Sequence, residues 1–128
     1  MNLRTSAPTR AIILFGHGSR DPLWRAPIEE AARRTQALAG DALVRCAYLE
    51  LTTPDLPTVA AEAIAAGARE LRIVPMFLGV GRHAREDLPA LVQQLKERYA
   101  DVRVELAPSV GEDPRLLELL ARIAADHA

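Results

Sequence analysis

The sequence predicts an α/β protein in which a four-stranded parallel sheet lies between two layers of helices. Four short apolar runs, each rich in Ile, Val, Leu or an aromatic residue, alternate with four segments of helical periodicity. Strict alternation of this kind is typical of parallel sheets with right-handed crossovers and helices on both faces. A chain of 128 residues with 49% hydrophobic residues is long enough for one domain with its own core.

The predicted strands are the four apolar runs. Two of them, 11–15 and 70–77, are almost continuously apolar, as expected of strands that helices cover on both sides. The other two are 43–49 and 102–106. We expect one domain over residues 1–128, with a flavodoxin-like strand order 2-1-3-4 and with residues 1–10 frayed.

Start signals precede three of the four predicted helices. Each signal combines an N-capping carboxylate with a proline at or near the first helical position. The three signals are Asp21-Pro22, Asp55 with Pro57, and Asp113-Pro114. Gly40 and Gly67 close the first two helices. The third helix is predicted from a single apolar stripe, made of Leu88, Leu91, Val92, Leu95 and Tyr99.

Composition excludes several classes of protein. A formal net charge of −1 lacks the basic footprint of a nucleic-acid binder. The apolar run 11–15 is too short for a signal peptide or a membrane span. Cys46 is the single cysteine, which favours a reducing compartment. We therefore expect a cytoplasmic protein with neither nucleic-acid nor membrane partners.

The topology predicts where a ligand binds. In open α/β sheets the site lies beyond the carboxyl ends of the strands where the strand order reverses, here between strands 1 and 3. The loops at those ends are 16–21 and 78–87, and they carry His17 and His83. The glycines around His17 either form a tight turn only or expose its imidazole to a cleft. The topology therefore predicts that both imidazoles lie at one site.

A nucleotide site is the weaker interpretation of the second loop. Gly79-x-Gly81-x-x-Ala84 follows a strand and leads into a helix, and Glu105 lies near the position of a ribose-binding acid. Too little sheet follows this motif for a complete nucleotide-binding half, which argues against it.

The alternative to a nucleotide site is a site that binds a metal ion transiently. Two imidazoles can bind Co²⁺, Ni²⁺ or Fe²⁺, or accept protons near neutral pH. Glu50 and Glu86 are candidate third ligands, although each also fits a solvated or helix-capping carboxylate. An incomplete ligand set suits a metal that is held briefly and handed on. Three arginines surround these loops, either as solvated charges or for recognition of substrate carboxylates; they are Arg20, Arg82 and Arg85.

Several segments together resemble one known family. They are 16–22 (GHGSRDP), 48–54 (YLELTTP), 74–78 (VPMFL), 81–83 (GRH), 86–89 (EDLP) and 108–113 (PSVGED). The chain from about residue 11 to 124 is similar in these motifs to the class II tetrapyrrole chelatases, and specifically to the short form of the sirohydrochlorin cobaltochelatase and ferrochelatase family.

The resemblance implies a function and a set of site residues. It implies a chelatase-like fold and insertion of Co²⁺, Fe²⁺ or Ni²⁺ into sirohydrochlorin without ATP, with the metal as substrate and no permanently bound cofactor. His17 and His83 match the two active-site histidines, and Glu50 is a further candidate metal ligand. The residues expected to contact the substrate are Ser19, Arg20, Arg82, Arg85, Phe77 and Leu78. The short form also implies a homodimer. A tetrapyrrole or metal carrier without catalysis remains the alternative function.

Overall fold

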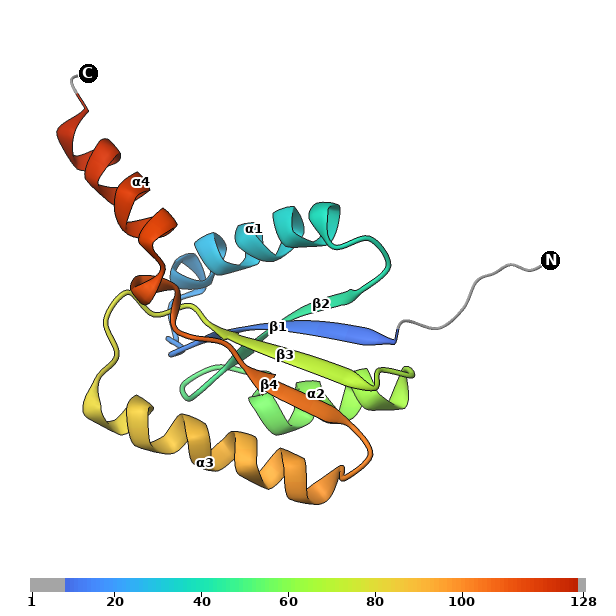
Figure 1. Cartoon of the computed structure of the whole chain (residues 1–128). Coiled ribbons are helices and arrows are strands. Elements are labelled where there is room, and N and C mark those ends of the chain that lie inside the picture. The colour runs from blue at the N-terminus through green and yellow to red at the C-terminus, as the bar shows by residue number, and fades with distance from the viewer. Residues whose placement is uncertain (1–8, 127–128) are drawn as a thin grey trace.

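The computed structural model describes residues 9–126, which form a parallel sheet with helices on both sides (Figure 1). The strands are β1 (Arg10–Gly16), β2 (Leu43–Tyr48), β3 (Glu70–Pro75) and β4 (Arg103–Leu106). The helices are α1 (Pro22–Leu38), α2 (Leu56–Ala65), α3 (Arg82–Arg98) and α4 (Pro114–Ala125), with a 3-10 turn, η1 (Val110–Glu112), before α4. The strand order β2-β1-β3-β4 and the parallel pairing confirm the predicted sheet.

The three predicted helix caps are confirmed. The carboxylate of Asp21 accepts the N–H of Leu23 at 2.9 Å at the start of α1. The caps of α2 and α4 follow the same pattern, with Asp55 accepting from Thr58 at 2.9 Å and Asp113 accepting from Arg115 at 2.8 Å. Each cap satisfies a backbone N–H that has no partner within its own helix, which fixes where the helix begins.

The start of α3 differs from the prediction. The sequence indicated a loop over 78–87, but the helix begins at Arg82, so the prediction that His83 lies in a loop is wrong. His83 instead lies in the first turn of α3. The N-cap is Gly81, which has no side chain that could accept a hydrogen bond. This helix start therefore lacks the capping signal that marked the other three.

Two apolar clusters hold the layers together. The larger one lies between the sheet and α2 and α3, and it includes Ile13 and Phe15 from β1. The smaller one lies between the sheet and α1, where Leu14 and Val44 pack with Ile28. Alternate residues of β1 thus face opposite layers, which explains why this strand is apolar throughout.

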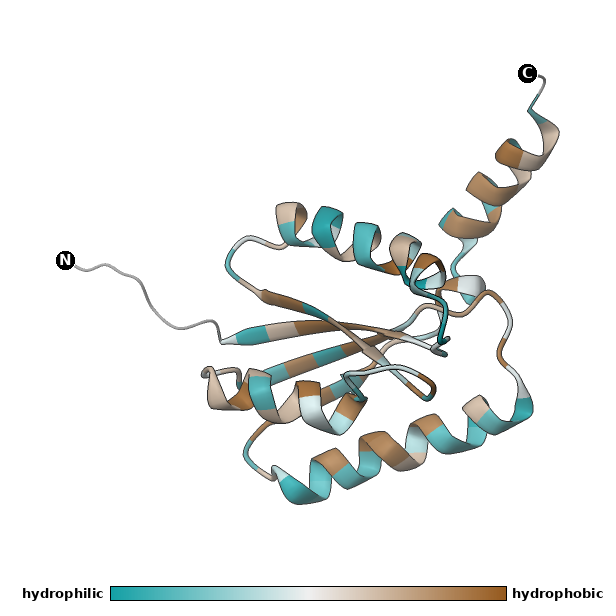
Figure 2. Ribbon diagram, turned by 180° about the vertical axis from the view of Figure 1, so that it is seen from behind, coloured by the Kyte–Doolittle hydropathy of each residue, from teal (hydrophilic) through white to brown (hydrophobic). Residues whose placement is uncertain are grey.

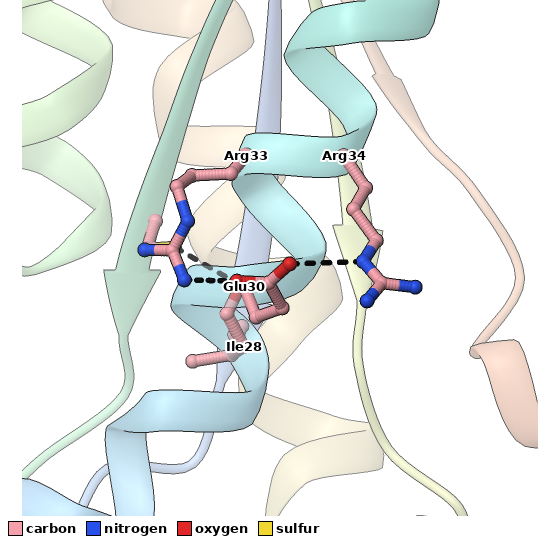
Figure 3. A network of polar contacts seen from close by, with 5 residues as sticks. Ile28, Glu30, Arg33 and Arg34 are labelled. Atoms are coloured by element: carbon pink, nitrogen blue, oxygen red, sulfur yellow. Dashed lines mark hydrogen bonds and ion pairs between the residues drawn. The ribbon is translucent and has the colours of Figure 1, made fainter.

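The outer face of α1 is charged. Glu30 forms ion pairs with Arg33 and with Arg34, the latter at 2.9 Å between Oε2 and Nε (Figure 3). The guanidinium groups of Arg34 and Arg33 hold the pKa of the Glu30 carboxyl below its usual value. Ile28 is the buried residue of α1, on the side that faces the sheet. The pattern of α1 is that of a helix with one face on a sheet and the other in water.

The fourth helix covers neither face of the sheet. Helices cover both faces of the sheet, as the sequence predicted, but α4 lies on neither face and none of its residues is buried. Figure 1 shows α4 projecting from the end of the sheet beyond η1. The layers of the fold are therefore α1, the sheet, and α2 with α3.

The first described residues of the chain are held by the sheet. β1 begins at Arg10, and the carbonyl of Thr9 accepts the N–H groups of Arg69 and Glu70 at 2.8 and 3.2 Å. Residues 9 and 10, which were expected to fray, are therefore held by the sheet, while 1–8 and 127–128 lie outside the described residues.

Among helices of the described chain, none is long and apolar enough to cross a membrane.

Candidate active site

The strand ends bring three segments together. In the sheet register, Gly16 at the end of β1 pairs with Tyr48 of β2, and Phe15 pairs with Pro75 of β3. The segments that follow β1, β2 and β3 therefore leave the sheet at one edge. This edge includes the gap between β1 and β3, where the strand order reverses.

His17 leaves β1 at this edge and lies over an aromatic ring. Its imidazole stacks on the phenyl ring of Phe77, with ring centroids 4.1 Å apart and ring planes at 26°. Phe77 is only 2% exposed, and its ring meets that of Phe15 edge to face with centroids 6.1 Å apart. The imidazole is thus supported from the core side, while His17 as a whole is exposed.

Gly18 is required by the backbone beside His17. Its φ is +105°, and a Cβ atom at this position would lie 1.7 Å from the carbonyl oxygen of Glu50. The N–H of Glu50 donates to the carbonyl of His17 at 3.0 Å. The glycine therefore allows the loop after β1 to pack against the segment after β2. This packing brings the backbone of Glu50 beside the backbone of His17.

His83 lies on a different element. It is exposed in the first turn of α3, where its neighbour Arg82 forms an ion pair with Glu86 at 3.6 Å. Across residues 9–126, no group of three or more His, Cys, Asp and Glu side chains is placed to hold a metal ion. One copy of the chain therefore does not assemble His17, His83 and Glu50 into a three-ligand cluster.

The other predicted contact residues are spread around the same edge. Arg20 is exposed. The hydroxyl of Ser19 accepts the N–H of Asp21 at 3.1 Å, which steadies the turn into α1. Leu78 is exposed whereas Phe77 is buried beneath His17, so of these two apolar side chains only Leu78 is open to solvent.

A cavity of about 720 Å³ lies between the start of α3 and the segment after β4. Arg85 is one of its lining residues, together with Ser109 and Glu112. The carboxylate of Glu112 accepts the N–H of Ser109 at 3.3 Å, in a capping box around η1. Sequence reasoning gave these two residues no role, although the Ser-x-x-Glu spacing is the signature of a capping box.

Comparison with known proteins gives a consistent set of matches. A family model described as CbiX matches residues 11–127. The chain is 25% identical over 130 residues to a sirohydrochlorin cobaltochelatase from Methanopyrus kandleri, an alignment that covers 86% of this chain and 91% of that protein. It is 29% identical over 111 residues to the sirohydrochlorin ferrochelatase of Bacillus subtilis, covering 85% of this chain but 42% of that protein.

A solved structure matches as well. The crystal structure of a cobalamin (vitamin B12) biosynthesis CbiX protein from Marinobacter aquaeolei VT8 superimposes with a TM-score of 0.79 at 34% sequence identity. The match covers 90% of this chain and 93% of that one. The described fold thus recurs in a chain of similar length.

Proposed function

The chain belongs to the CbiX family, and from that premise we propose that it inserts Co²⁺, Fe²⁺ or Ni²⁺ into sirohydrochlorin without ATP. The observation that carries the proposal is the family match over residues 11–127, together with relatives named sirohydrochlorin cobaltochelatase and sirohydrochlorin ferrochelatase. The metal ion and the tetrapyrrole are both substrates, and no permanently bound cofactor is part of the proposal. The product would enter cobalamin, sirohaem or a related tetrapyrrole.

The proposed chemistry requires weak ligands and a base. Insertion exchanges the water ligands of the ion for macrocycle nitrogens and removes two pyrrole protons. Imidazole is suited to both tasks because it binds borderline divalent ions when neutral and exchanges protons near neutral pH. We assign these tasks to His17 and His83, which are exposed beyond the sheet and at the start of α3.

The proposed site offers the metal ion only a few protein ligands. A closed site with four strong ligands holds its metal permanently, whereas a site with few protein ligands can release it. Glu50, held beside His17 by the backbone contacts at Gly18, is the proposed additional ligand.

We propose that positive charge and one apolar side chain bind the macrocycle. Arginine recognises carboxylates with directed N–H donors, and sirohydrochlorin carries carboxylates around its rim. Arg20, Arg82 and Arg85 are exposed, and Arg85 lines the cavity beside η1. Leu78, which follows β3, offers exposed apolar surface.

The proposed working unit is a homodimer of one-domain chains. One chain presents a ligand set from one side only, whereas a binding site usually buries most of its ligand. A two-fold pairing of identical patches is the commonest way to supply the second side. The single cysteine, Cys46, favours a reducing compartment, so we place the reaction in the cytoplasm.

An absorbance assay tests this function. Purified protein is mixed with an excess of sirohydrochlorin and with Co²⁺, Fe²⁺ or Ni²⁺ in turn, and metallation is followed against protein-free reactions. A chelatase converts many equivalents per chain with at least one metal. Binding that stops at one equivalent, without turnover, would replace the proposed enzyme with a tetrapyrrole or metal carrier.

A further inference from the structure

Leu51 has a backbone conformation that leucine rarely adopts. Its φ is +69°, in the left-handed region, where a residue with a Cβ atom crowds its own backbone. Among residues 9–126, Leu51 is the one residue other than glycine with a positive φ. Glycine or asparagine would fit this position with less strain. Strained residues of this kind cluster at functional sites, so the choice of a large apolar side chain here calls for an explanation.

Hydrogen bonds on both sides hold the segment that carries Leu51. Before it, the N–H of Glu50 donates to the carbonyl of His17 at 3.0 Å. After it, the guanidinium group of Arg25 donates to the hydroxyl of Thr52 at 3.0 Å. These contacts keep the strained conformation in place. The fold therefore fixes Leu51 beside the loop that carries His17.

Two exposed leucines flank that loop. Leu51 is 49% exposed and Leu78 is 64% exposed, although both side chains are large and apolar. The strand order β2-β1-β3 places the segment after β2, with Leu51, on one side of the segment after β1, and the segment after β3, with Leu78, on the other. Figure 2 shows hydrophobic residues on both flanking segments. The proposed metal ligand His17 thus lies between two apolar side chains that are open to solvent.

We infer that Leu51 is a specificity-determining residue that contacts the apolar face of the macrocycle, on the opposite side of His17 from Leu78. The inference rests on the proposed function and adds a second apolar contact to it. Neighbouring strands lie about 4.8 Å apart, so the segments after β2 and β3 leave the sheet about 10 Å apart. This spacing is comparable with the width of a tetrapyrrole ring. A flat ring above His17 therefore reaches both leucines.

Leu51 recognises a different part of the substrate from the charged residues. The arginines are proposed to bind carboxylates at the rim, and His17 to bind the metal ion. Leucine has no atom that could bind an ion or exchange a proton, so Leu51 contributes only by removing apolar ring surface from water. Loss of its side chain should therefore weaken binding of the macrocycle and leave the affinity for the metal unchanged.

The substitution Leu51→Asn separates binding from stability. Asparagine has a branched side chain of similar shape and tolerates a positive φ, so the strain falls while the apolar surface is lost. Titration of metal-free sirohydrochlorin, followed by absorbance, should give a Kd about tenfold above that of the wild type. The midpoint of thermal unfolding should equal or exceed the wild-type value. Leu51→Gly also suits the backbone and replaces Leu51→Asn if that variant fails to fold.

Two control variants accompany the test. Leu51→Met keeps an apolar side chain at the same position and should retain most of the affinity. Leu38→Asn makes the same change at a leucine that is 89% exposed at the end of α1, and it should bind sirohydrochlorin as the wild type does. In the metallation assay Leu51→Asn should raise KM for sirohydrochlorin about tenfold, with kcat and KM for the metal unchanged.

Four results would overturn the contact. The first is a wild-type Kd in Leu51→Asn, and the second is an equal loss of affinity in Leu51→Met or in Leu38→Asn. The third is a fall in the unfolding midpoint of both Leu51→Asn and Leu51→Gly, which would show that the side chain is held for packing. The fourth is altered sedimentation of Leu51→Asn, which would assign the side chain to a contact between copies of the chain.

The same measurements separate the contact from the proposed function. A protein that metallates sirohydrochlorin while Leu51→Asn binds it as the wild type does would keep the proposed activity and lose the contact. A protein that binds sirohydrochlorin through Leu51 without turnover would lose the proposed activity and keep the contact. A wild type that does not bind sirohydrochlorin would overturn both.

Discussion

The imidazole of His17 and the phenyl ring of Phe77 form a stacked pair, with centroids 4.1 Å apart and planes at 26°. The two residues follow different strands, His17 after β1 and Phe77 after β3. Because Phe77 is buried, its ring is a fixed surface against which the exposed imidazole is held. We therefore propose that Phe77 positions the imidazole of His17.

Phe77→Leu is expected to lower kcat/KM for the metal about tenfold or more, because the leucine side chain cannot hold the imidazole in one orientation. The matched control is Phe15→Leu, a substitution in the same buried cluster that keeps both stacked rings while it removes the edge-to-face contact of Phe15 with Phe77. Both variants should lose about 1 to 3 kcal/mol of stability. Equal activity losses in the two would show that core packing, not positioning of His17, accounts for the effect.

His17→Ala and His83→Ala are each expected to lower the rate of metallation about 100-fold or more. Both side chains are exposed, so neither substitution opens a cavity in the core. Thermal unfolding should accordingly shift by only a few degrees. A variant that metallates sirohydrochlorin at the wild-type rate, after subtraction of the uncatalysed reaction, would remove its histidine from the mechanism.

Gly18→Ala is expected to destabilise the protein by about 2 kcal/mol or more and to lower activity with it. The residue has a positive φ, and an added Cβ would strike the carbonyl oxygen of Glu50. Gly79→Ala is the control, because a Cβ there meets nothing within 4 Å. Urea unfolding and the metallation assay read out both effects. A Gly18→Ala protein as stable as the control would mean that the loop after β1 relaxes freely.

The sequence predicted most of the sheet because local signals and global topology agree. Asp21, Asp55 and Asp113 marked three helix starts, and the alternating pattern led to the observed strand order. The predicted start of α3 was wrong because Gly81 provides no side-chain cap, so nothing before Arg82 signals a helix. The stack of His17 on Phe77 joins residues that are far apart in the sequence, so no local pattern signals it.

The position of α4 could not be predicted for a different reason. Its amphipathic pattern predicts that its apolar face is covered. The pattern does not specify which surface supplies that cover. Contacts of η1 with the backbone after β3 decide the direction of α4. Such contacts depend on tertiary structure and leave no periodicity in the sequence.

Tyr48 is expected to make stability sensitive to alkaline pH. Burial is the main cause that raises the pKa of its phenol to about 12, and the side chain is 2% exposed. The folded state therefore favours the neutral phenol, so its contribution to stability is complete below the ordinary tyrosine pKa near 10 and is lost as pH rises from there through about 12.

Tyr48→Phe should abolish this alkaline loss in thermal unfolding measured between pH 9 and pH 12. Within the described structure the Tyr48 hydroxyl is buried without a hydrogen-bond partner, so its removal should cost little stability at neutral pH. Tyr99→Phe is the control, since Tyr99 is only partly buried. An alkaline loss that is the same in Tyr48→Phe and in the wild type would assign it to other groups.

The metal dependence of the pH profile tests whether the histidines act as ligands. A proton and a divalent ion compete for the same imidazole nitrogen, so the rate should fall on acidification, and added metal should move that acid limb to lower pH. The measurement is the initial rate of metallation against pH at several metal concentrations, all below those at which the metal precipitates. His17→Gln keeps a polar side chain but cannot exchange a proton for the ion in this range, so its limb should respond less to metal. In the contrary case the acid limb stays at one pH across a wide range of metal concentration, in the wild type and in His17→Gln alike. That result would show that neither histidine binds the ion in its neutral form. A carboxylate such as Glu50 would then have to replace the histidines as ligand.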